Sequence, residues 1–394
     1  MMPGKAPRKD ASDIRPLKIL QTNFHLEWNG QVARVFLLSR ELIRKGHRAV
    51  IAAPEKSALV ERARSVGIPV FTSVRFKKAN RLISFLLDVI ALGRLIREEG
   101  FDCLHAHGSQ DTWALVWARR LFRLRQPILL TRHNTKHVRF HFGNRWLYRR
   151  GIDRVVVVSA AAMDNYRRFL DANILKERDI PIIHSCIDLD RFTKAPDPEK
   201  IRTELNVGKG APIIGLIGRV GQDKGHFVLL EAIPKVLNEF PEAVFVFAGN
   251  MGGLGPTMRE AVRNKGLEKS VRLLGFREDI LDITAALDVS VLPSLGTDSS
   301  PAVLKEALYL GKPVVASRIA GLPEIVRGDA GILVAPGNAA ELAQAIAATL
   351  RNLKNGKGPS REFPEQFTPR FMCDAYLRVY EELRTRSAGA GEFA

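Results

Sequence analysis

Residues 291–326 read VLPSLGTDSSPAVLKEALYLGKPVVASRIAGLPEIV and place a strand, a loop, a helix and a second strand in direct succession. The apolar run Val289–Leu292, stopped by a proline, predicts a buried parallel strand, and turn-forming residues follow it. A helix is predicted over 301–310, with Ser300 as its N-cap and a glycine directly after it. The next strand is predicted at 313–317, so the segment is typical of a doubly wound sheet.

Two carboxylates lie in this segment. Asp298 precedes a helix N-terminus at the carboxyl end of a strand, where doubly wound sheets bind ligands and free N–H groups favour anions. Glu306 lies within the helix among apolar neighbours, where a carboxylate is costly unless it meets donors such as sugar hydroxyls. The alternative is that Glu306 pairs with Lys305 or Lys312 at a partly hydrated surface.

The spacing of these residues resembles a known pattern. Asp298 is followed after seven residues by Glu306-Ala307, then by Gly-Lys-Pro-Val-Val-Ala-Ser and Gly-Leu-Pro-Glu-Ile-Val. This order resembles the donor-site signature of retaining glycosyltransferases of family four, whose usual form has Glu at both acidic positions. The resemblance implies that Glu306 holds the donor ribose and that Asp298 holds sugar hydroxyls. Ser299 and Ser300 are assigned to the same donor site.

Composition predicts a globular protein of two domains. The chain has 394 residues, of which 46% are apolar and 26% charged. It contains no run near the roughly 18–20 uncharged apolar residues of a membrane span, and residues 1–16 are polar and basic without a signal-peptide core. These features, with three scattered cysteines, predict a cytoplasmic protein with ordinary buried thiols and no metal or redox motif.

Charge is unevenly distributed along the chain. Residues 1–190 carry 34 Lys and Arg against 18 Asp and Glu, a net charge of +16, whereas residues 191–394 carry 26 against 24, a net charge of +2. An excess confined to one half suggests that this half meets a polyanion, which could be nucleic acid, anionic lipid or a phosphorylated acceptor.

Short apolar runs alternate with amphipathic stretches through both halves, which predicts parallel sheets covered on both faces. In the first half the predicted elements are 17–22, 31–45, 47–53, 57–66, 70–73, 82–97, 103–106, 109–122, 128–131, 154–159, 160–170 and 182–184. In the second half they are 213–217, 226–240, 243–248, 257–265, 271–273, 280–285, 289–292, 301–310, 313–317 and 341–353. The fold class is therefore α/β.

The resemblance implies two Rossmann-like doubly wound domains that face each other across a cleft, the arrangement called GT-B. Residues 1–192 form the expected acceptor domain and residues 193–367 the expected donor domain. A last amphipathic helix, at 368–386, is expected to pack back on the first domain.

The second half opens with the loop Ile-Gly-Leu-Ile-Gly-Arg-Val-Gly-Gln-Asp-Lys-Gly, residues 214–225. Glycines such as Gly218 would let Arg219 and Lys224 converge on a diphosphate. Taken alone, such a loop is more often a solvated surface loop. The presence of Asp298 and Glu306 further along the chain favours the phosphate site, because members of the resembled family bind donor phosphates with Arg and Lys here. The glycine spacing is neither a dinucleotide fingerprint nor a Walker motif, which disfavours dehydrogenases and kinases.

In the first half, His107 ends the predicted strand of Leu-His-Ala-His-Gly, where the resembled family has a histidine near the scissile bond of the donor sugar. The alternative is a histidine bonded within the strand end. Gly30 opens the first helix, at a place where family members bring backbone amides to a phosphate. The resemblance also implies that the nucleobase binds near residues 247–250 and 274–277.

A further strand-end loop contains Arg132, His133 and Asn134, which could face the acceptor, although a solvated loop is the alternative. Asp188-Leu-Asp190 matches the metal-binding Asp-x-Asp of the other large glycosyltransferase fold. In the resembled family this segment is structural, and no histidine or cysteine pair has ligand spacing, so no metal site is predicted.

The resemblance implies a retaining, metal-independent hexosyltransferase without a cofactor. Its donor is a nucleotide-diphosphate sugar and its acceptor a lipid-linked or anionic envelope glycan such as lipopolysaccharide core. Alternatives are a sugar-nucleotide epimerase or phosphorylase on a related fold, or a non-catalytic polyanion binder. Nucleic acid is not expected as a partner, because aromatic residues near the basic clusters can pack inward as part of amphipathic helices.

Three basic clusters in the first half, Arg75–Lys78, Arg119–Arg125 and Arg145–Arg154, flank apolar or aromatic residues. This mixture suits an anionic membrane surface, where aromatic rings settle at head groups and cations meet phosphates. The protein is therefore predicted to be peripheral on the cytoplasmic face of the inner membrane. Phe76, Phe122, Trp146 and Tyr148 are the rings expected to take part.

Overall fold

The structure is a computed structural model that describes residues 15–77, 82–296, 298–359 and 362–389. Contacts divide the chain into two compact units. The first contains the chain up to His133, then His137–Cys186 and the segment from Thr368 onward, and the second contains Asn134–Lys136 and Ile187–Phe367. The division therefore falls after Cys186, whereas the sequence predicted a boundary after residue 192.

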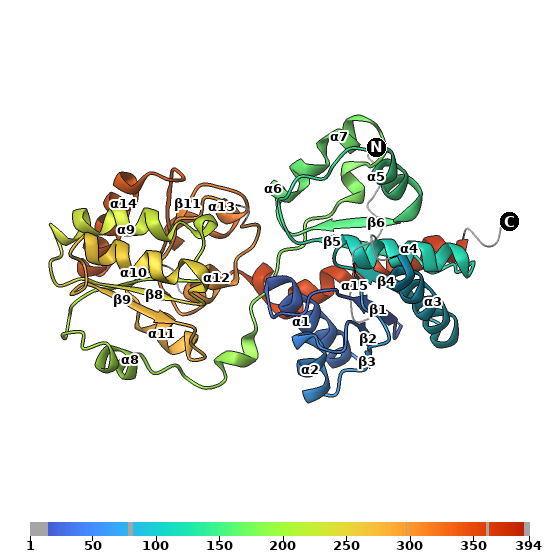
Figure 1. Cartoon of the computed structure of the whole chain (residues 1–394), viewed down its shortest axis with the longest axis horizontal. Helices are drawn as coiled ribbons and strands as arrows, with labels where there is room; N and C mark the ends of the chain where they lie inside the picture. The colour runs from blue at the N-terminus through green and yellow to red at the C-terminus, as the bar shows by residue number, and fades with distance from the viewer. Residues whose placement is uncertain (1–14, 78–81, 297, 360–361, 390–394) are drawn as a thin grey trace, which may run out of the picture. The chain divides into compact units, whose positions relative to one another are not determined.

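The first unit is built on a six-stranded parallel sheet with strand order β3-β2-β1-β4-β5-β6 (Figure 1). Its strands are β1 (Lys18–Thr22), β2 (Arg48–Ala52), β3 (Val70–Phe71), β4 (Cys103–Ala106), β5 (Ile128–Arg132) and β6 (Arg154–Val157). The two central strands pair in register, with Leu20 opposite Leu104.

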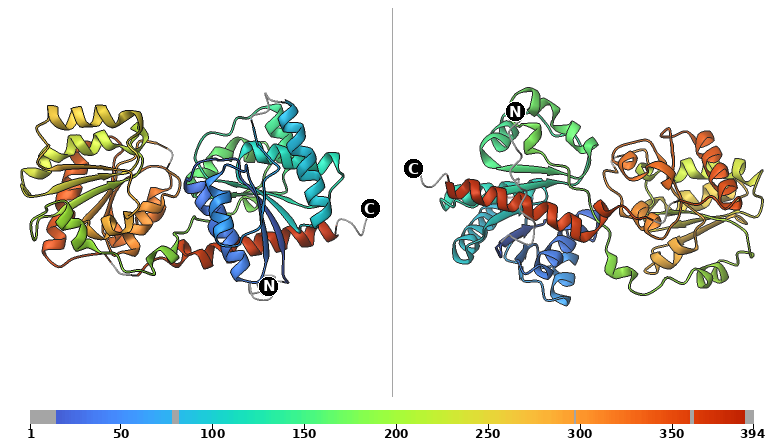
Figure 2. Two further views of the ribbon diagram at one scale, coloured as in Figure 1. Left: turned by 60° about the horizontal axis from the view of Figure 1, so that its bottom comes forward. Right: turned by 180° about the vertical axis from the view of Figure 1, so that it is seen from behind.

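Helices cover both faces of this sheet, as burial of both faces of a parallel sheet requires. Its helices are α1 (Gly30–Arg44), α2 (Ala58–Ser65), α3 (Leu82–Glu99), α4 (Ser109–Leu121), α5 (Phe142–Trp146), α6 (Ala160–Met163), α7 (Arg167–Asp171) and α15 (Pro369–Gly389). One hydrophobic core joins α1, α2 and α15 to the sheet, and a second joins α3 and α4 to the opposite face. Figure 2 shows α15 as a long helix lying along this sheet.

Two predicted elements of the first unit differ from the structure. The helix predicted over 160–170 is broken by a 3₁₀ turn at Asp164–Tyr166, which separates α6 from α7. The strand predicted over 182–184 is reduced to a single parallel bridge between Ile182 and Val157. Pro181, which precedes it, has no N–H to donate to a ladder.

The second unit repeats this plan, with a parallel sheet of order β12-β11-β10-β7-β8-β9. Its strands are β7 (Ile213–Ile217), β8 (Val244–Ala248), β9 (Val271–Gly275), β10 (Val289–Leu292), β11 (Val314–Ser317) and β12 (Gly331–Val334). Its helices are α8 (Pro198–Glu204), α9 (His226–Leu237), α10 (Gly255–Asn264), α11 (Ile280–Ala286), α12 (Ala302–Tyr309), α13 (Leu322–Ile325) and α14 (Ala339–Lys354). Helices α9, α10 and α14 share one core, while α8 and α11 share another.

The predictions omitted β12, α8 and α13. Strand β12 is a short edge strand that begins at Gly331, where an added Cβ would lie 1.9 Å from the carbonyl oxygen of Val314. A glycine that is needed for close approach of two backbones does not read as a strand former in the sequence.

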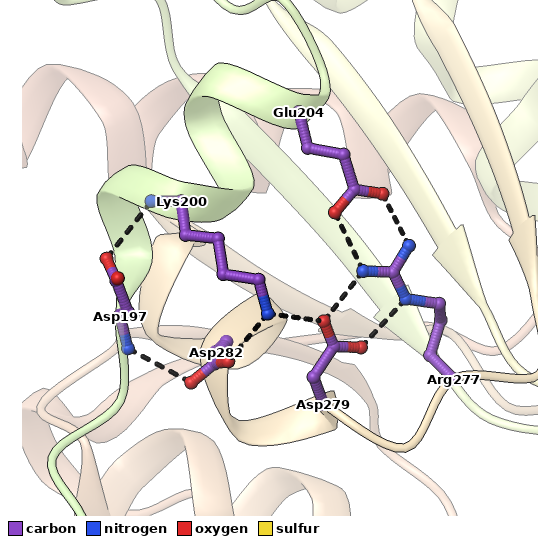
Figure 3. A network of polar contacts seen from close by, with 6 residues as sticks. All are labelled: Asp197, Lys200, Glu204, Arg277, Asp279 and Asp282. Atoms are coloured by element: carbon purple, nitrogen blue, oxygen red, sulfur yellow. Dashed lines mark hydrogen bonds and ion pairs between the residues drawn. The ribbon is translucent and has the colours of Figure 1, made fainter.

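Helix α8 is fixed to the rest of the second unit by a network of charged groups (Figure 3). Arg277, which follows β9, binds Glu204 at the end of α8 and Asp279 ahead of α11, with an Arg277 Nη2–Asp279 Oδ2 distance of 2.7 Å. Lys200 of α8 pairs with Asp279 and Asp282 at 3.5 and 3.6 Å. Arg277, within the segment 274–277 expected near the nucleobase, therefore has carboxylate partners on both sides of its guanidinium, and the role of this segment stays a prediction.

The three cysteines agree with the sequence-based expectation. Cys103, Cys186 and Cys373 are all buried and unpaired as disulfides. Burial raises the pKa of the Cys103 and Cys373 thiols far above the ordinary value, so neither is a reactive thiolate.

Candidate active site

In each sheet the first strand along the chain lies at the centre. The next two strands are added on one side of it and the last three on the other side, so the order of the strands reverses between the first and the fourth. In the first unit the switch lies between β1 and β4, and in the second it lies between β7 and β10. Ligands of doubly wound folds bind outside the carboxyl ends of the strands at this point. Gly30 and His107 follow β1 and β4, while Lys224 and Asp298 follow β7 and β10. We call the two places the β1–β4 site and the β7–β10 site.

Glycine geometry joins the loops of the β7–β10 site. Gly225 has a φ of +71°, and a Cβ added there would lie 1.8 Å from the carbonyl oxygen of Pro293, directly after β10. The Leu295 N–H also donates to the carbonyl of Asp223 at 2.9 Å. Only glycine permits so close an approach at position 225. The approach places the neighbouring Lys224 beside the loop that follows β10.

Lys224 and Asp298 form an ion pair in the β7–β10 site, and the Ser294 hydroxyl donates to the second oxygen of the same carboxylate. The side chains of Lys224 and Asp298 are 22% and 15% exposed, so solvent screens this pair only partly. Two residues selected 74 positions apart in the sequence are therefore brought together. Ser294 is a partner that the sequence did not identify.

Arg219 lies differently from the expectation that it converges with Lys224. Its guanidinium pairs with Asp223 at 3.2 Å, and its side chain is 63% exposed. Gly218, directly before it, has a φ of +153°, and a Cβ added there would meet no heavy atom within 4 Å. This open space lies at the carboxyl end of β7, where the predicted diphosphate would approach.

The helix after β10 begins one residue later than predicted. Pro301 is the N-cap of α12, with extended backbone dihedrals (φ −66°, ψ 131°), so Ser300 lies outside the helix. The Ser300 hydroxyl instead accepts a hydrogen bond from the ammonium of Lys305 at 2.9 Å. Ser299 is buried in the same loop.

Glu306 is 5% exposed and accepts a hydrogen bond from Arg191 Nη1 at 2.7 Å. The hydrogen bond that the structure shows for this carboxylate is thus to Arg191, whereas the surface-pair alternative proposed a lysine such as Lys305 or Lys312. Burial raises the pKa of Glu306, and the positive charges of Arg191 and Lys305 oppose this shift. Asp188, one member of the Asp-x-Asp pair, adds a negative charge that raises the pKa further.

In the β1–β4 site, Asn29 is the N-cap of α1 and its side-chain oxygen accepts from the N–H groups of Gln31 and Val32 at 3.0 and 3.1 Å. This residue therefore occupies two amides that a phosphate could otherwise use. A Cβ added at Gly30 would meet nothing within 4 Å, so the fold itself does not require glycine at this position.

His107 is buried at the carboxyl end of β4, and both of its ring nitrogens have protein partners. Nδ1 lies 2.9 Å from Nε2 of His133, and Nε2 lies 2.6 Å from Oε1 of Gln21. An amide oxygen only accepts, so His107 Nε2 carries the proton and His107 Nδ1 accepts from His133. Burial lowers the pKa of His107 to about 3, so the imidazole is neutral near pH 7.

The hydrogen bonds continue from Gln21 into α15. Gln21 Nε2 donates to the Tyr380 hydroxyl at 3.0 Å, and that hydroxyl donates to His105 Nδ1 at 2.6 Å. His105 Nε2 then donates to the Thr131 hydroxyl at 2.7 Å, which lies 2.9 Å from the Tyr376 hydroxyl. Buried tyrosine hydroxyls need such partners. The sequence predicted an amphipathic helix here but did not reveal the polar role of these two tyrosines.

The three predicted acceptor residues, which are consecutive in the chain, have different surroundings. Arg132 is the last residue of β5 and is half-buried, and His133 belongs to the same unit and pairs with His107. Asn134 falls in the short segment that groups with the second unit, and its side chain accepts from the Lys136 N–H at 3.1 Å.

Within the described ranges, no group of three or more His, Cys, Asp or Glu side chains is arranged to hold a metal ion. In the same part of the chain, no helix is both long and apolar enough to cross a membrane.

Sequence profiles of two known families match the chain. The family described as Glycosyltransferase Family 4 matches residues 28–191, and the family described as Glycosyl transferases group 1 matches residues 211–352. The two matches cover every strand of the two sheets except β1, and they include Gly30, His107, Lys224 and Asp298.

Individual proteins resemble the chain at 20–31% sequence identity. It is 31% identical over 220 residues to D-inositol 3-phosphate glycosyltransferase of Corynebacterium jeikeium, and this match spans about half of that relative (52% of each chain). It is 28% identical over 302 residues to phosphatidyl-myo-inositol mannosyltransferase of Mycobacterium leprae, covering 74% of this chain and 76% of that one. A crystal structure of a glycosyltransferase from Rickettsia africae aligns over 94% of this chain and 99% of that chain, with a TM-score of 0.80 at 20% identity.

Proposed function

Because the chain belongs to the family-four glycosyltransferases and has their GT-B fold, we propose that it transfers a hexose-type sugar, with retention, from a nucleotide-diphosphate donor. The observation that carries this proposal is the Lys224–Asp298 ion pair at the switch point of the second sheet. A fixed cation beside a carboxylate provides, in one place, a partner for phosphate and a partner for sugar hydroxyls.

In this proposal Lys224 and Arg219 stabilise negative charge on the departing diphosphate. A bound diphosphate competes with Asp298 for the Lys224 ammonium and so releases the carboxylate to accept hydrogen bonds from the sugar. Arg219 is exposed and can leave Asp223 at little cost, because an exposed ion pair contributes only about 0–1 kcal/mol. Glu306 would accept from the ribose hydroxyls, held in place by Arg191.

His107 would act as a neutral hydrogen-bonding group near the sugar. Its low pKa excludes the imidazolium form near pH 7, so it cannot serve there as a cationic acid. Both ring nitrogens are occupied in the ligand-free chain, so a sugar hydroxyl would replace His133 or Gln21 as its partner.

The proposed acceptor is a lipid-linked or envelope glycan, such as lipopolysaccharide core, reached at the cytoplasmic face of the inner membrane. The net charge of +16 in residues 1–190 supports an anionic acceptor or surface. A relative of this chain is named for a phosphatidyl-linked acceptor, which supports a lipid. Metal independence is part of the same proposal, since Arg219 and Lys224 can supply positive charge at the leaving group.

Donor binding tests the proposal. Saturation-transfer NMR on a panel of nucleotide sugars should give signals from one donor, and Lys224→Met should abolish them. Lys235→Met, which changes an exposed lysine of α9, is the matched control and should leave binding intact. Absence of binding by every nucleotide sugar, or equal binding by Lys224→Met, would contradict the assignment of this site.

A further inference from the structure

Helix α3 exposes a row of large aliphatic side chains, which we call the α3 stripe. Its members are Leu82, Ile83, Leu86, Leu87 and Ile90, between 36% and 77% exposed. They recur at the spacing of one helix face and extend over about 12 Å at 1.5 Å per residue. Isolated exposed leucines are ordinary, but five on one face form a contiguous apolar surface that calls for a partner.

The stripe cannot turn inward, because the opposite face of α3 is already packed. Val89, Leu92 and Ile96 are buried in the core beneath the helix. The Asp88 carboxylate accepts from the N–H groups of Arg75 and Phe76 at 2.7 and 2.8 Å, which fixes the first turns of the helix.

Contact with α4 fixes the rotation of α3 further along. A Cβ added at Gly93 would lie 2.2 Å from the ring of Phe122, so α3 lies directly against the end of α4 (Figure 1). Arg97 lies over the same ring, 4.9 Å from its centre. The orientation that exposes the stripe is therefore a consequence of packing.

Positive charge borders the stripe. Arg94 follows Ile90 by four residues and Arg97 follows it by seven, so both continue the same helix face, and both are exposed. Between Asp111 and Asp153 the chain has ten lysine and arginine residues and no aspartate or glutamate. An apolar row bordered by cations is the pattern of helices that lie in the interface of an anionic bilayer.

The neighbouring helix extends this surface. Trp117 and Leu121 of α4 are four residues apart and are 46% and 62% exposed. Arg120, beside them, lies over the Trp146 ring at 4.7 Å from its centre. Tryptophan and arginine together suit the head-group region of a membrane.

The four aromatic residues that the sequence predicted to meet the membrane are not the residues exposed on α3 and α4. Phe76 and Tyr148 are 3% and 7% exposed and belong to the core, which corrects their assignment to a membrane surface. Phe122 and Trp146 are half-buried beneath Arg97 and Arg120. Lys78, in the first basic cluster, lies outside the described residues.

We propose that the α3 stripe, with Arg94, Arg97 and the exposed face of α4, docks on the surface of an anionic lipid bilayer. The inference deepens the proposed function, since it names the face that would meet a lipid-linked acceptor, but it does not depend on the donor chemistry. A protein partner is the alternative occupant of the stripe, but the cations that continue its helix face, Arg94 and Arg97, favour an anionic lipid surface. The lipid surface accounts for both features.

Vesicle co-sedimentation of the full chain tests this proposal. Vesicles of phosphatidylcholine containing phosphatidylglycerol should bind the protein, while phosphatidylcholine alone should bind it weakly. Binding should decrease steeply with added salt, because charges separated by more than a Debye length of about 8 Å at physiological ionic strength are screened. Equal binding to both vesicles, or no binding to either, would overturn the proposal.

Two variants with matched controls locate the surface. Ile83→Asn with Leu87→Asn should weaken binding at least tenfold, because two aliphatic groups would no longer enter the interface. The same exchange at Ile43 and Val66, exposed on the elements that cover the other face of the sheet, should leave binding unchanged. If both double variants bind like the unchanged chain, α3 is not the docking face.

A charge reversal gives an independent readout. Arg94→Glu should weaken binding to phosphatidylglycerol vesicles about fivefold or more, since each basic residue near the surface contributes about 1 kcal/mol. Arg259→Glu, an equally exposed change in the second unit, should have no effect. Association of the chain with a protein that Ile83→Asn prevents, without any vesicle binding, would identify a protein partner and refute the lipid. Vesicle binding without nucleotide-sugar binding would support this inference and contradict the proposed function.

Discussion

Removal of the Tyr380 hydroxyl tests whether α15 positions His107. Tyr380→Phe keeps the ring in the core and removes one atom, which pairs with Gln21 at 3.0 Å and with His105 at 2.6 Å. Two buried polar groups then lose a partner, at a cost of about 1–3 kcal/mol each, so the free energy of unfolding should fall by about 2–6 kcal/mol.

The same change should affect catalysis through Gln21. Without Tyr380 to accept from its amide, Gln21 can rotate and present its NH₂ group to His107, which reverses the proton position on the imidazole. We expect kcat to fall while KM for the donor changes little. The nitrogen chemical shifts of His107 should change from the Nε2–H to the Nδ1–H pattern, a signature that loss of stability alone would not produce.

Tyr376→Phe is the matched control. Its hydroxyl lies at the far end of the chain of hydrogen bonds, 2.9 Å from Thr131, and does not touch Gln21. This variant should lose stability but keep the His107 tautomer and most of kcat. Equal loss of kcat in both variants, or full activity with an unchanged tautomer in Tyr380→Phe, would refute the positioning role.

Three further predictions concern charge. Lys224→Ala and Arg219→Ala should each reduce transfer at least tenfold while the protein stays folded, since one charge-assisted hydrogen bond contributes about 1.5–3 kcal/mol; near-normal turnover in both would contradict the site. EDTA should leave the transfer rate unchanged, whereas a loss that manganese or magnesium restores would return Asp188 and Asp190 to consideration. In the folded chain His107 has a pKa of about 3 and stays neutral above that pH, whereas in the unfolded chain it gains a proton below about pH 6.5. The free energy of unfolding should therefore decrease as the pH is lowered from about 6.5 to about 3. Compared with His107→Gln, the unchanged chain should lose about 1.4 kcal/mol more in unfolding free energy between pH 8 and pH 5.5, and identical losses in urea titrations would contradict the shift.

The fold could be predicted closely wherever an apolar run ends abruptly. Strands β4, β7 and β10 have the predicted limits, because each is a short, fully buried and mostly apolar run that is followed by turn formers. The edge strand β12 escaped prediction because it starts with a glycine and is only half-buried. Elements at sheet edges carry a weaker sequence signal than elements at the centre.

The roles assigned to the site residues stay predictions, and the sequence could not predict which of these residues pair. The approach of Gly225 to Pro293 decides that Lys224 meets Asp298, and no local pattern encodes contact between distant loops. The same holds for the Arg191 partner of Glu306. The α3 stripe could not be predicted for another reason. In the segment 82–96 apolar residues occur on nearly every face of the helix, so their periodicity does not show which face is exposed.

The central claim is retaining transfer of a sugar from a nucleotide donor to a lipid-linked acceptor. Its most direct test uses the donor found by NMR, labelled in the sugar, with a bacterial glycolipid extract as acceptor, and determines the anomeric configuration of the product by NMR. The account predicts that label enters the lipid fraction, that the new bond keeps the configuration of the donor, and that no sugar turns over without acceptor. Inverted configuration, or an epimerised sugar or sugar phosphate formed without acceptor, would contradict it.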